Sequence, residues 1–144
     1  MLAVILLDLD GFKPVNDRYG HLAGDSVLQQ VARRLEGSLP QDVVLARLGG
    51  DEFALLLAGT TEVTDIDEVM GHVQEAFIEP FVAVGVPVSV GASLGAGWFP
   101  EHGHRIEALL ARADHAMYAA KRERHASARS LPPLSALDDR LTVA

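Results

Sequence analysis

Apolar residues run without interruption from Leu2 to Leu7, and this run predicts a short strand that is buried on both faces. Two further apolar runs, at residues 43–45 and 53–57, flank Gly49-Gly50. Because two glycines can turn the chain with positive φ at little steric cost, these runs predict a hairpin. Residues 81–84 and 86–96 predict two more sheet strands.

Three other segments carry apolar residues at helical spacing: one that begins at Asp25, one at 64–77 and one at 106–121. The resulting order, β-α-β-β-α-β-β-α, predicts an α/β sandwich. The inward positions expected in the three helices are Val27, Leu28, Val31 and Leu35; Ile66, Val69, Met70, Val73 and Phe77; and Leu109, Leu110, Ala113, Met117 and Tyr118.

Acidic residues stand where the predicted strands end. The first strand ends at Asp8-Leu9-Asp10-Gly11, where Asp8 and Asp10 share one face and the Leu9 carbonyl is free once strand pairing stops. Asp51 and Glu52 follow the two glycines of the hairpin and point to opposite faces. If the two strands are neighbours, Asp8, the Leu9 carbonyl and Asp51 converge as oxygen ligands for a pair of hard cations. Ordinary turn chemistry is the alternative for each acidic pair taken alone.

Three ordered segments resemble one known family. They are the run from Leu7 to Asp25 (LDLDGFKPVNDRYGHLAGD), the run 47–53 (RLGGDEF), and Ser93-Leu94-Gly95 followed by residues 113–121 (ADHAMYAAK). Together they resemble a GGDEF domain, the diguanylate cyclase family, over residues 3 to 125. The domain is therefore expected at 1–125, and residues 126–144 are expected to form a linker or tail, with another element starting at 134–143.

The resemblance implies a palm-like nucleotidyl-cyclase fold, in which a central, mostly antiparallel sheet is flanked by helices, here without the family's N-terminal helix. It implies condensation of two GTP molecules to cyclic di-GMP with release of pyrophosphate, by a homodimer with two Mg²⁺ (or Mn²⁺) ions per active site. Asp8, the Leu9 carbonyl and Asp51 occupy the family's metal-ligand positions. The resemblance also implies that Asp51 and Glu52 are the catalytic carboxylates, with Glu52 either as a metal partner or as the base toward the 3′-hydroxyl.

The resemblance also assigns the nucleotide contacts. Asn16 and Asp25 are the guanine-binding pair, although the residues alone favour Asp25 as the N-cap of its helix. The turn Gly11-Phe12-Lys13 and Lys121 are assigned as the phosphate-binding residues. The alternative role for Lys121 is that of a cation that complements a helix C-terminus. The chain departs from the family at His125, where a second phosphate-binding cation is usual; the neighbouring Arg124 is a possible substitute. It departs again at Pro40 and Val43, in place of the Arg-x-x-Asp feedback site.

The amino-acid composition disfavours several classes of binding partner and site. The 144 residues hold 12 Lys and Arg against 20 Asp and Glu, a net charge of −8, which disfavours nucleic-acid polymers and anionic membranes as partners. No cysteine is present, so disulfides and thiolate metal sites are excluded. The first apolar run is too short to span a bilayer, and GTP as substrate implies a cytoplasmic protein.

Two functions from different classes stay open. One is the diguanylate cyclase, which Asp8, Asp51 and Glu52 favour. The other is a catalytically inactive GTP-binding module that controls an adjacent domain, which the His125 departure and the missing N-terminal helix favour. In multidomain relatives, an upstream sensory domain and a downstream phosphodiesterase domain are the expected neighbours.

Overall fold

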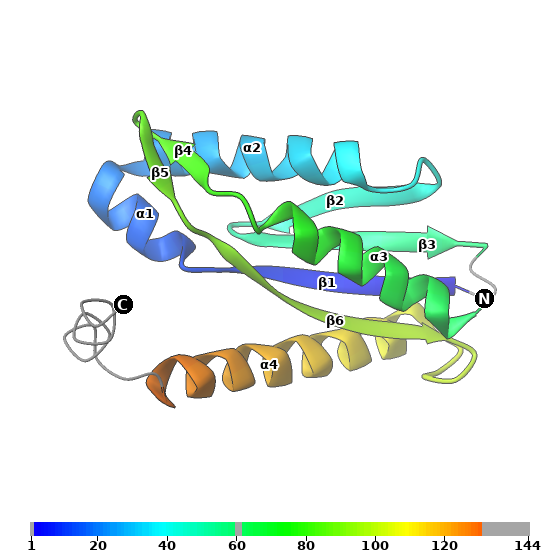
Figure 1. The fold of residues 1–144 in the computed structure, drawn as a ribbon. Coiled ribbons are helices and arrows are strands. Elements are labelled where there is room, and N and C mark those ends of the chain that lie inside the picture. The colour runs from blue at the N-terminus through cyan, green and yellow to red at the C-terminus, as the bar shows by residue number, and fades with distance from the viewer. Residues whose placement is uncertain (1, 60–61, 131–144) are drawn as a thin grey trace, which may run out of the picture.

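The computed structural model describes residues 2–59 and 62–130 (Figure 1). Within these residues no helix is long and apolar enough to cross a membrane. In chain order, the elements are β1 (Leu2–Asp10), α1 (Phe12–Tyr19), α2 (His21–Ser38), β2 (Val43–Gly49), β3 (Glu52–Ala58), α3 (Val63–Ala76), β4 (Phe81–Ala83), β5 (Val86–Val88), β6 (Gly91–Phe99) and α4 (Ile106–Ser130).

The main sheet has the strand order β2-β3-β1-β6, and every neighbouring pair is antiparallel. The expected α/β fold, an antiparallel sheet flanked by helices, is therefore confirmed. The expected hairpin joins β2 to β3. The expected strand 86–96 is wrong as a single element, because β5 pairs with β4 in a separate two-stranded sheet and β6 begins only at Gly91.

Helices lie on both sides of the main sheet (Figure 1), and alternate residues of β1 face these two helical layers. Its odd-numbered apolar residues, Ala3 to Leu9, belong to the core formed with α1, α2 and α3. Val4 and Leu6 instead pack with Leu109 and Ala113 of α4 on the other face. Because side chains alternate along a strand, Asp8 and Asp10 continue the α4 face beyond Leu6. The two carboxylates therefore meet α4 rather than the larger core.

Helix α4 approaches β6 without side chains between the two backbones. A Cβ at Gly95 would overlap the Ala113 carbonyl and the Met117 backbone, and one at Gly97 would overlap the Leu109 carbonyl. This close contact fixes the height of α4 above the sheet, and thereby the positions of the polar residues in its last turns.

Several expected helix details are wrong. The helix expected from Asp25 begins at His21, with Gly20 as its N-cap, so Asp25 lies inside α2 and does not cap it. An additional helix, α1, follows Gly11. Helix α4 continues past 121 to Ser130, so residues 126–130 of the expected tail are helical. Leu110 and Tyr118 of α4 are exposed rather than inward. The element expected at 134–143 lies outside the described residues.

Candidate functional site

The tip of the β2–β3 hairpin is held by an arginine. Arg47 donates hydrogen bonds from Nε and Nη2 to the Gly50 carbonyl, at 3.1 Å and 2.8 Å. Gly50 adopts a left-handed conformation with φ of 52°, and the β2–β3 register shifts between Arg47 and Gly49. Asp51 follows this fixed turn, and its carbonyl accepts a hydrogen bond of 3.1 Å from the Leu9 N–H. The turn thus places Asp51 beside the end of β1. Sequence reasoning missed the role of Arg47, which shows no spacing signal of its own.

The end of β1 departs in part from expectation. Pairing with β3 stops at Asp8 and Glu52, but pairing with β6 continues to Asp10 and Gly91. The Leu9 N–H donates to the Asp51 carbonyl, and the N–H and C=O groups of one strand residue point to the same side of the strand. The Leu9 carbonyl therefore faces the hairpin tip, on the side where the β1–β3 ladder has ended.

Three carboxylates share the electrostatic environment at these strand ends. Glu52 lies directly opposite Asp8 across the β1–β3 pair. Burial raises the pKa of Asp51, and the neighbouring Asp8 charge raises it further. The pKa of Glu52 is also raised, first by burial and then by Asp8 and Asp114. Like charges held this close disfavour joint ionisation, and a cation at this place would relieve the repulsion.

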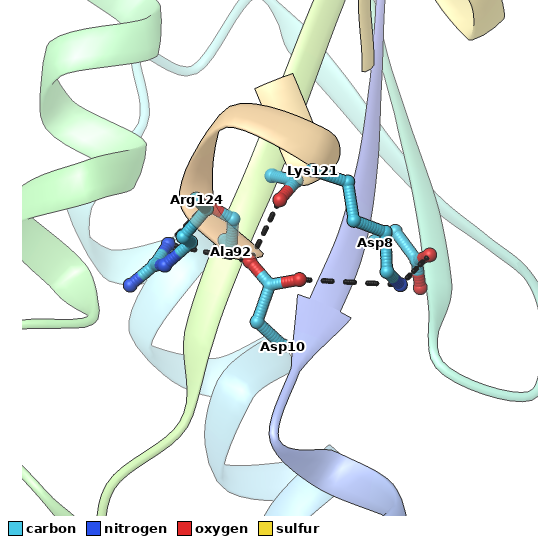
Figure 2. A network of polar contacts seen from close by, with 6 residues as sticks. Asp8, Asp10, Ala92, Lys121 and Arg124 are labelled. Atoms are coloured by element: carbon cyan, nitrogen blue, oxygen red, sulfur yellow. Dashed lines mark hydrogen bonds and ion pairs between the residues drawn. The ribbon is translucent and has the colours of Figure 1, made fainter. Parts of the chain in front are cut away.

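The ammonium of Lys121 lies against the carboxylates at the end of β1. Lys121 Nζ lies 2.6 Å from Asp8 Oδ2 and 3.9 Å from Asp10 Oδ1 (Figure 2). Burial acts to lower the pKa of Lys121, but its hydrogen bond and charge attraction to Asp8, with smaller contributions from Asp10 and Asp51, leave that pKa raised. Lys121 is thus a charged ammonium at neutral pH.

The donor set fits a hard divalent cation. In the described part of the chain, no group of three or more His, Cys, Asp or Glu side chains is arranged to hold a metal ion. Mg²⁺, however, commonly takes only one or two protein carboxylates, together with substrate phosphates and water. The site offers two carboxylates, those of Asp8 and Asp51, together with the Leu9 carbonyl. The ion pair between Lys121 and Asp8 shows that this carboxylate already binds a positive charge.

The expected guanine residues lie on two adjacent helices. Asn16 of α1 lies directly over Gly24 of α2, so that a Cβ at Gly24 would overlap its amide. Asp25 is the next residue of α2 and lines a groove of about 440 Å³ between this helix and the hairpin. The other residues that line the groove are Leu28, Gln29, Ala32, Glu36, Leu45, Arg47 and Phe53. The role of Gly24 as space for Asn16 was not predicted.

The expected phosphate turn is the start of α1. Gly11, with φ of 80°, is its N-cap, and Phe12 and Lys13 are its first residues. Their N–H groups have no acceptor within the helix, because the first turn lacks preceding carbonyls. The Phe12 side chain is buried, and Lys13 is exposed. Backbone donors and one ammonium are therefore available directly after Asp10.

Arg124 is engaged within the chain. Its Nη1 donates a hydrogen bond of 2.8 Å to the Ala92 carbonyl and lies 3.3 Å from Asp10 Oδ2 (Figure 2). Its guanidinium also covers Gly91. The structure thus gives Arg124 a different task from replacing the phosphate cation missing at His125. Sequence reasoning missed this contact because it joins residues far apart in the chain.

The comparisons with known proteins agree with this site. The family model described as "Diguanylate cyclase, GGDEF domain" matches residues 1–127. The chain belongs to the GGDEF family. Diguanylate cyclase TpbB of Pseudomonas aeruginosa is 43% identical to this GGDEF domain over 129 residues, and the match covers 89% of the chain and 30% of TpbB. The crystal structure of the TpbB (YfiN) GGDEF domain superposes with a TM-score of 0.81 at 43% identity, covering 85% of this chain and 76% of that one.

A relative that is named for a different activity also matches this chain. Cyclic di-GMP phosphodiesterase PdeR of Escherichia coli is 42% identical over 120 residues, which cover 83% of this chain and 18% of PdeR. The chain therefore spans less than a third of the length of either curated relative. Membership of the family is shown, whereas the activity of the whole protein is a separate question.

Proposed function

We propose that this GGDEF domain is a diguanylate cyclase, which condenses two GTP molecules into cyclic di-GMP and releases pyrophosphate. The observation that carries the proposal is the meeting of Asp8 and Asp51 at the neighbouring ends of β1 and β3, with Lys121 balancing their charge. A purely structural role does not require this arrangement, because it places like charges together in a half-buried position.

The residues have separate tasks in this reaction. Asp8, Asp51 and the Leu9 carbonyl would hold Mg²⁺ or Mn²⁺, which when bound supplies Lewis-acid activation and offsets phosphate charge. The N–H groups at the start of α1, with Lys13 and Lys121, would bind the triphosphate. Glu52 takes part either in holding the metal or as the base toward the 3′-hydroxyl. That oxygen attacks the α-phosphorus of the second GTP, and pyrophosphate leaves.

Each domain would hold one GTP, so the product requires two domains face to face. A homodimer is therefore the proposed catalytic unit, and a cytoplasmic location follows from GTP as substrate. An upstream sensory domain and a downstream phosphodiesterase domain are the proposed neighbours of this domain.

Product analysis tests the proposed activity. We expect the purified chain to convert GTP with Mg²⁺ into cyclic di-GMP and pyrophosphate, both quantified by chromatography. Product formation should stop when EDTA is added. Product that forms equally well with EDTA would contradict the metal-assisted mechanism.

A GTP-binding regulator without catalysis is the second candidate. It is favoured by His125 at a position where the family usually has a phosphate-binding cation, and by the similarity to a protein named a phosphodiesterase. In that case, calorimetry would detect GTP binding by a folded protein that forms no cyclic di-GMP at any protein concentration.

Substitution of Gly24 tests the guanine assignment. Gly24→Ala should displace the Asn16 amide and lower kcat/KM for GTP by about tenfold or more, because a buried guanine edge loses a hydrogen-bond partner. The melting temperature should change little, since the atoms that must move belong to two side chains, the Asn16 amide and the Phe12 ring, and not to the backbone. Gly37→Ala in the same helix, which meets open space, is the matched control. An unchanged ratio of GTP to ATP turnover in Gly24→Ala would contradict the assignment of Asn16.

A further inference from the structure

One side-chain oxygen of Asp10 accepts no hydrogen bond from the described residues. The side chain is 11% exposed, and its Oδ2 accepts a hydrogen bond of 2.7 Å from the Ser93 hydroxyl and lies 3.3 Å from Arg124 Nη1. The other oxygen, Oδ1, is buried without a hydrogen-bond partner among the described residues. A buried acceptor left unsatisfied is destabilising, because it has lost its hydrogen bonds to water. The site therefore contains a fixed carboxylate oxygen that is ready to accept a donor.

The ammonium of Lys121 lies close to this oxygen. Its Nζ lies 3.9 Å from Asp10 Oδ1, while it binds Asp8 Oδ2 at 2.6 Å. Figure 2 shows the two carboxylates on either side of this nitrogen. Because N–H···O hydrogen bonds reach to about 3.2 Å, a shift of about 1 Å toward Asp10 would complete the second bond. The close packing of α4 on Gly95 fixes the backbone, so only the outer part of the lysine side chain has to move.

Asp10 is held so that it cannot follow the lysine. Ser93 and Arg124 bind its Oδ2 from β6 and α4, and the backbone of Asp10 is paired with Gly91. Asp8 and Asp10 therefore offer two fixed acceptor positions for one mobile ammonium. At present, Lys121 is bound to the position that the proposed metal requires.

We propose that Lys121 moves from Asp8 to Asp10 when a divalent cation binds Asp8, and that Asp10 is a positioning residue for this exchange. The inference rests on the proposed function, since it concerns the same metal site. Lys121 competes with the cation in the nucleotide-free protein, because two cations cannot share one carboxylate edge without repulsion. Asp10 lowers the cost of displacing Lys121 by giving the ammonium a second acceptor.

The exchange has consequences for binding in the nucleotide-free protein. Removing the Lys121 charge should tighten metal binding, because the competitor is gone. Removing the Asp10 charge should weaken it, because the displaced ammonium has no acceptor. The second effect should depend on the first, since without Lys121 there is nothing for Asp10 to receive.

The test is Mn²⁺ binding to the nucleotide-free chain, measured from the EPR signal of free Mn²⁺. We expect Lys121→Met to lower the Kd for Mn²⁺ about tenfold, and Lys121→Gln to act in the same direction. Asp10→Asn should raise the Kd about fivefold in the wild-type background and less than about twofold together with Lys121→Met. Arg122→Met, an exposed cation on the same helix, is the matched control and should leave the Kd unchanged.

Three results would overturn the exchange. An unchanged Kd in both Lys121 variants would show that the lysine does not compete with the ion. An equal effect of Asp10→Asn in both backgrounds would show that Asp10 acts on the ion directly. Mn²⁺ binding that is as strong in Asp8→Asn as in the wild type would contradict the metal site itself, and with it the proposed function.

Discussion

Asp51→Asn is expected to lower the rate of cyclic di-GMP formation by about a thousandfold or more. The substitution removes a carboxylate ligand from the proposed metal site while it keeps the size of the side chain and the fixed turn made by Arg47 and Gly50. The rate is measured by chromatography of the product at saturating GTP and Mg²⁺. Asp42→Asn, which changes an exposed carboxylate just before β2, is the matched control.

The same substitution should stabilise the nucleotide-free protein at neutral pH. The pKa of Asp51 is raised above its usual value of 3.8, so folding disfavours its ionised form. The stability that this group contributes is full below the unfolded-state pKa and is lost as the pH rises through the folded-state pKa. Asparagine does not titrate. The melting temperature of Asp51→Asn should therefore exceed that of the wild type at pH 7, and the difference should disappear near pH 3.

Full turnover by Asp51→Asn would contradict the assignment of this carboxylate. A melting temperature at pH 7 below that of the wild type would instead show that Asp51 stabilises the fold in its charged form. The two readouts are independent, because one concerns the reaction and the other the empty site.

Gly95→Val is expected to lower the free energy of unfolding by about 3 kcal/mol or more. A side chain at this position would overlap the backbone of Ala113 and Met117. Backbone atoms cannot change rotamer to relieve the overlap, as a flexible side chain can. Helix α4 would have to move away from β6, which also withdraws Lys121 from Asp8. The free energy is measured by urea unfolding followed by circular dichroism.

Gly71→Ala provides the contrasting control in a helix. A Cβ at Gly71 of α3 meets open space, so alanine should raise the stability by up to about 1 kcal/mol through better helix propensity. If Gly95→Val unfolds at the same urea concentration as the wild type, α4 does not rest on the β6 backbone in solution.

Three strands, β1, β2 and β3, were predictable because each contains a continuous apolar run with a glycine or a carboxylate beside it. The β1 run and the two sides of the hairpin have this pattern, and their antiparallel pairing brings Asp8 opposite Glu52 as the candidate site requires. The position of the candidate site was therefore predictable from the acidic residues and glycines at the strand ends.

Helix α1 was not predictable from its pattern. It has only eight residues, of which Phe12 and Val15 are buried, and helices this short depend on tertiary packing rather than on propensity. The start of α2 was missed for a related reason. Its N-cap is Gly20, which makes no side-chain capping bond, so Asp25 offered the stronger local signal.

The network around Lys121 was also beyond sequence reasoning. The contact between Lys121 and Asp8 joins residues 113 positions apart, and it depends on how closely α4 approaches β6. The resemblance placed Lys121 among the phosphate contacts, whereas the structure shows its ammonium on Asp8. No local pattern indicates that Ser93 and Arg124 hold Asp10 beside it.

The most direct test of the proposed two-GTP reaction is the specific activity of the chain across protein concentrations at which light scattering reports both monomer and dimer. We predict that cyclic di-GMP formation per milligram of protein rises in proportion to the dimer fraction and is absent from Asp51→Asn throughout. Full specific activity in the monomer, or no cyclic di-GMP from a folded dimer, would contradict a catalytic unit made of two domains that each hold one GTP.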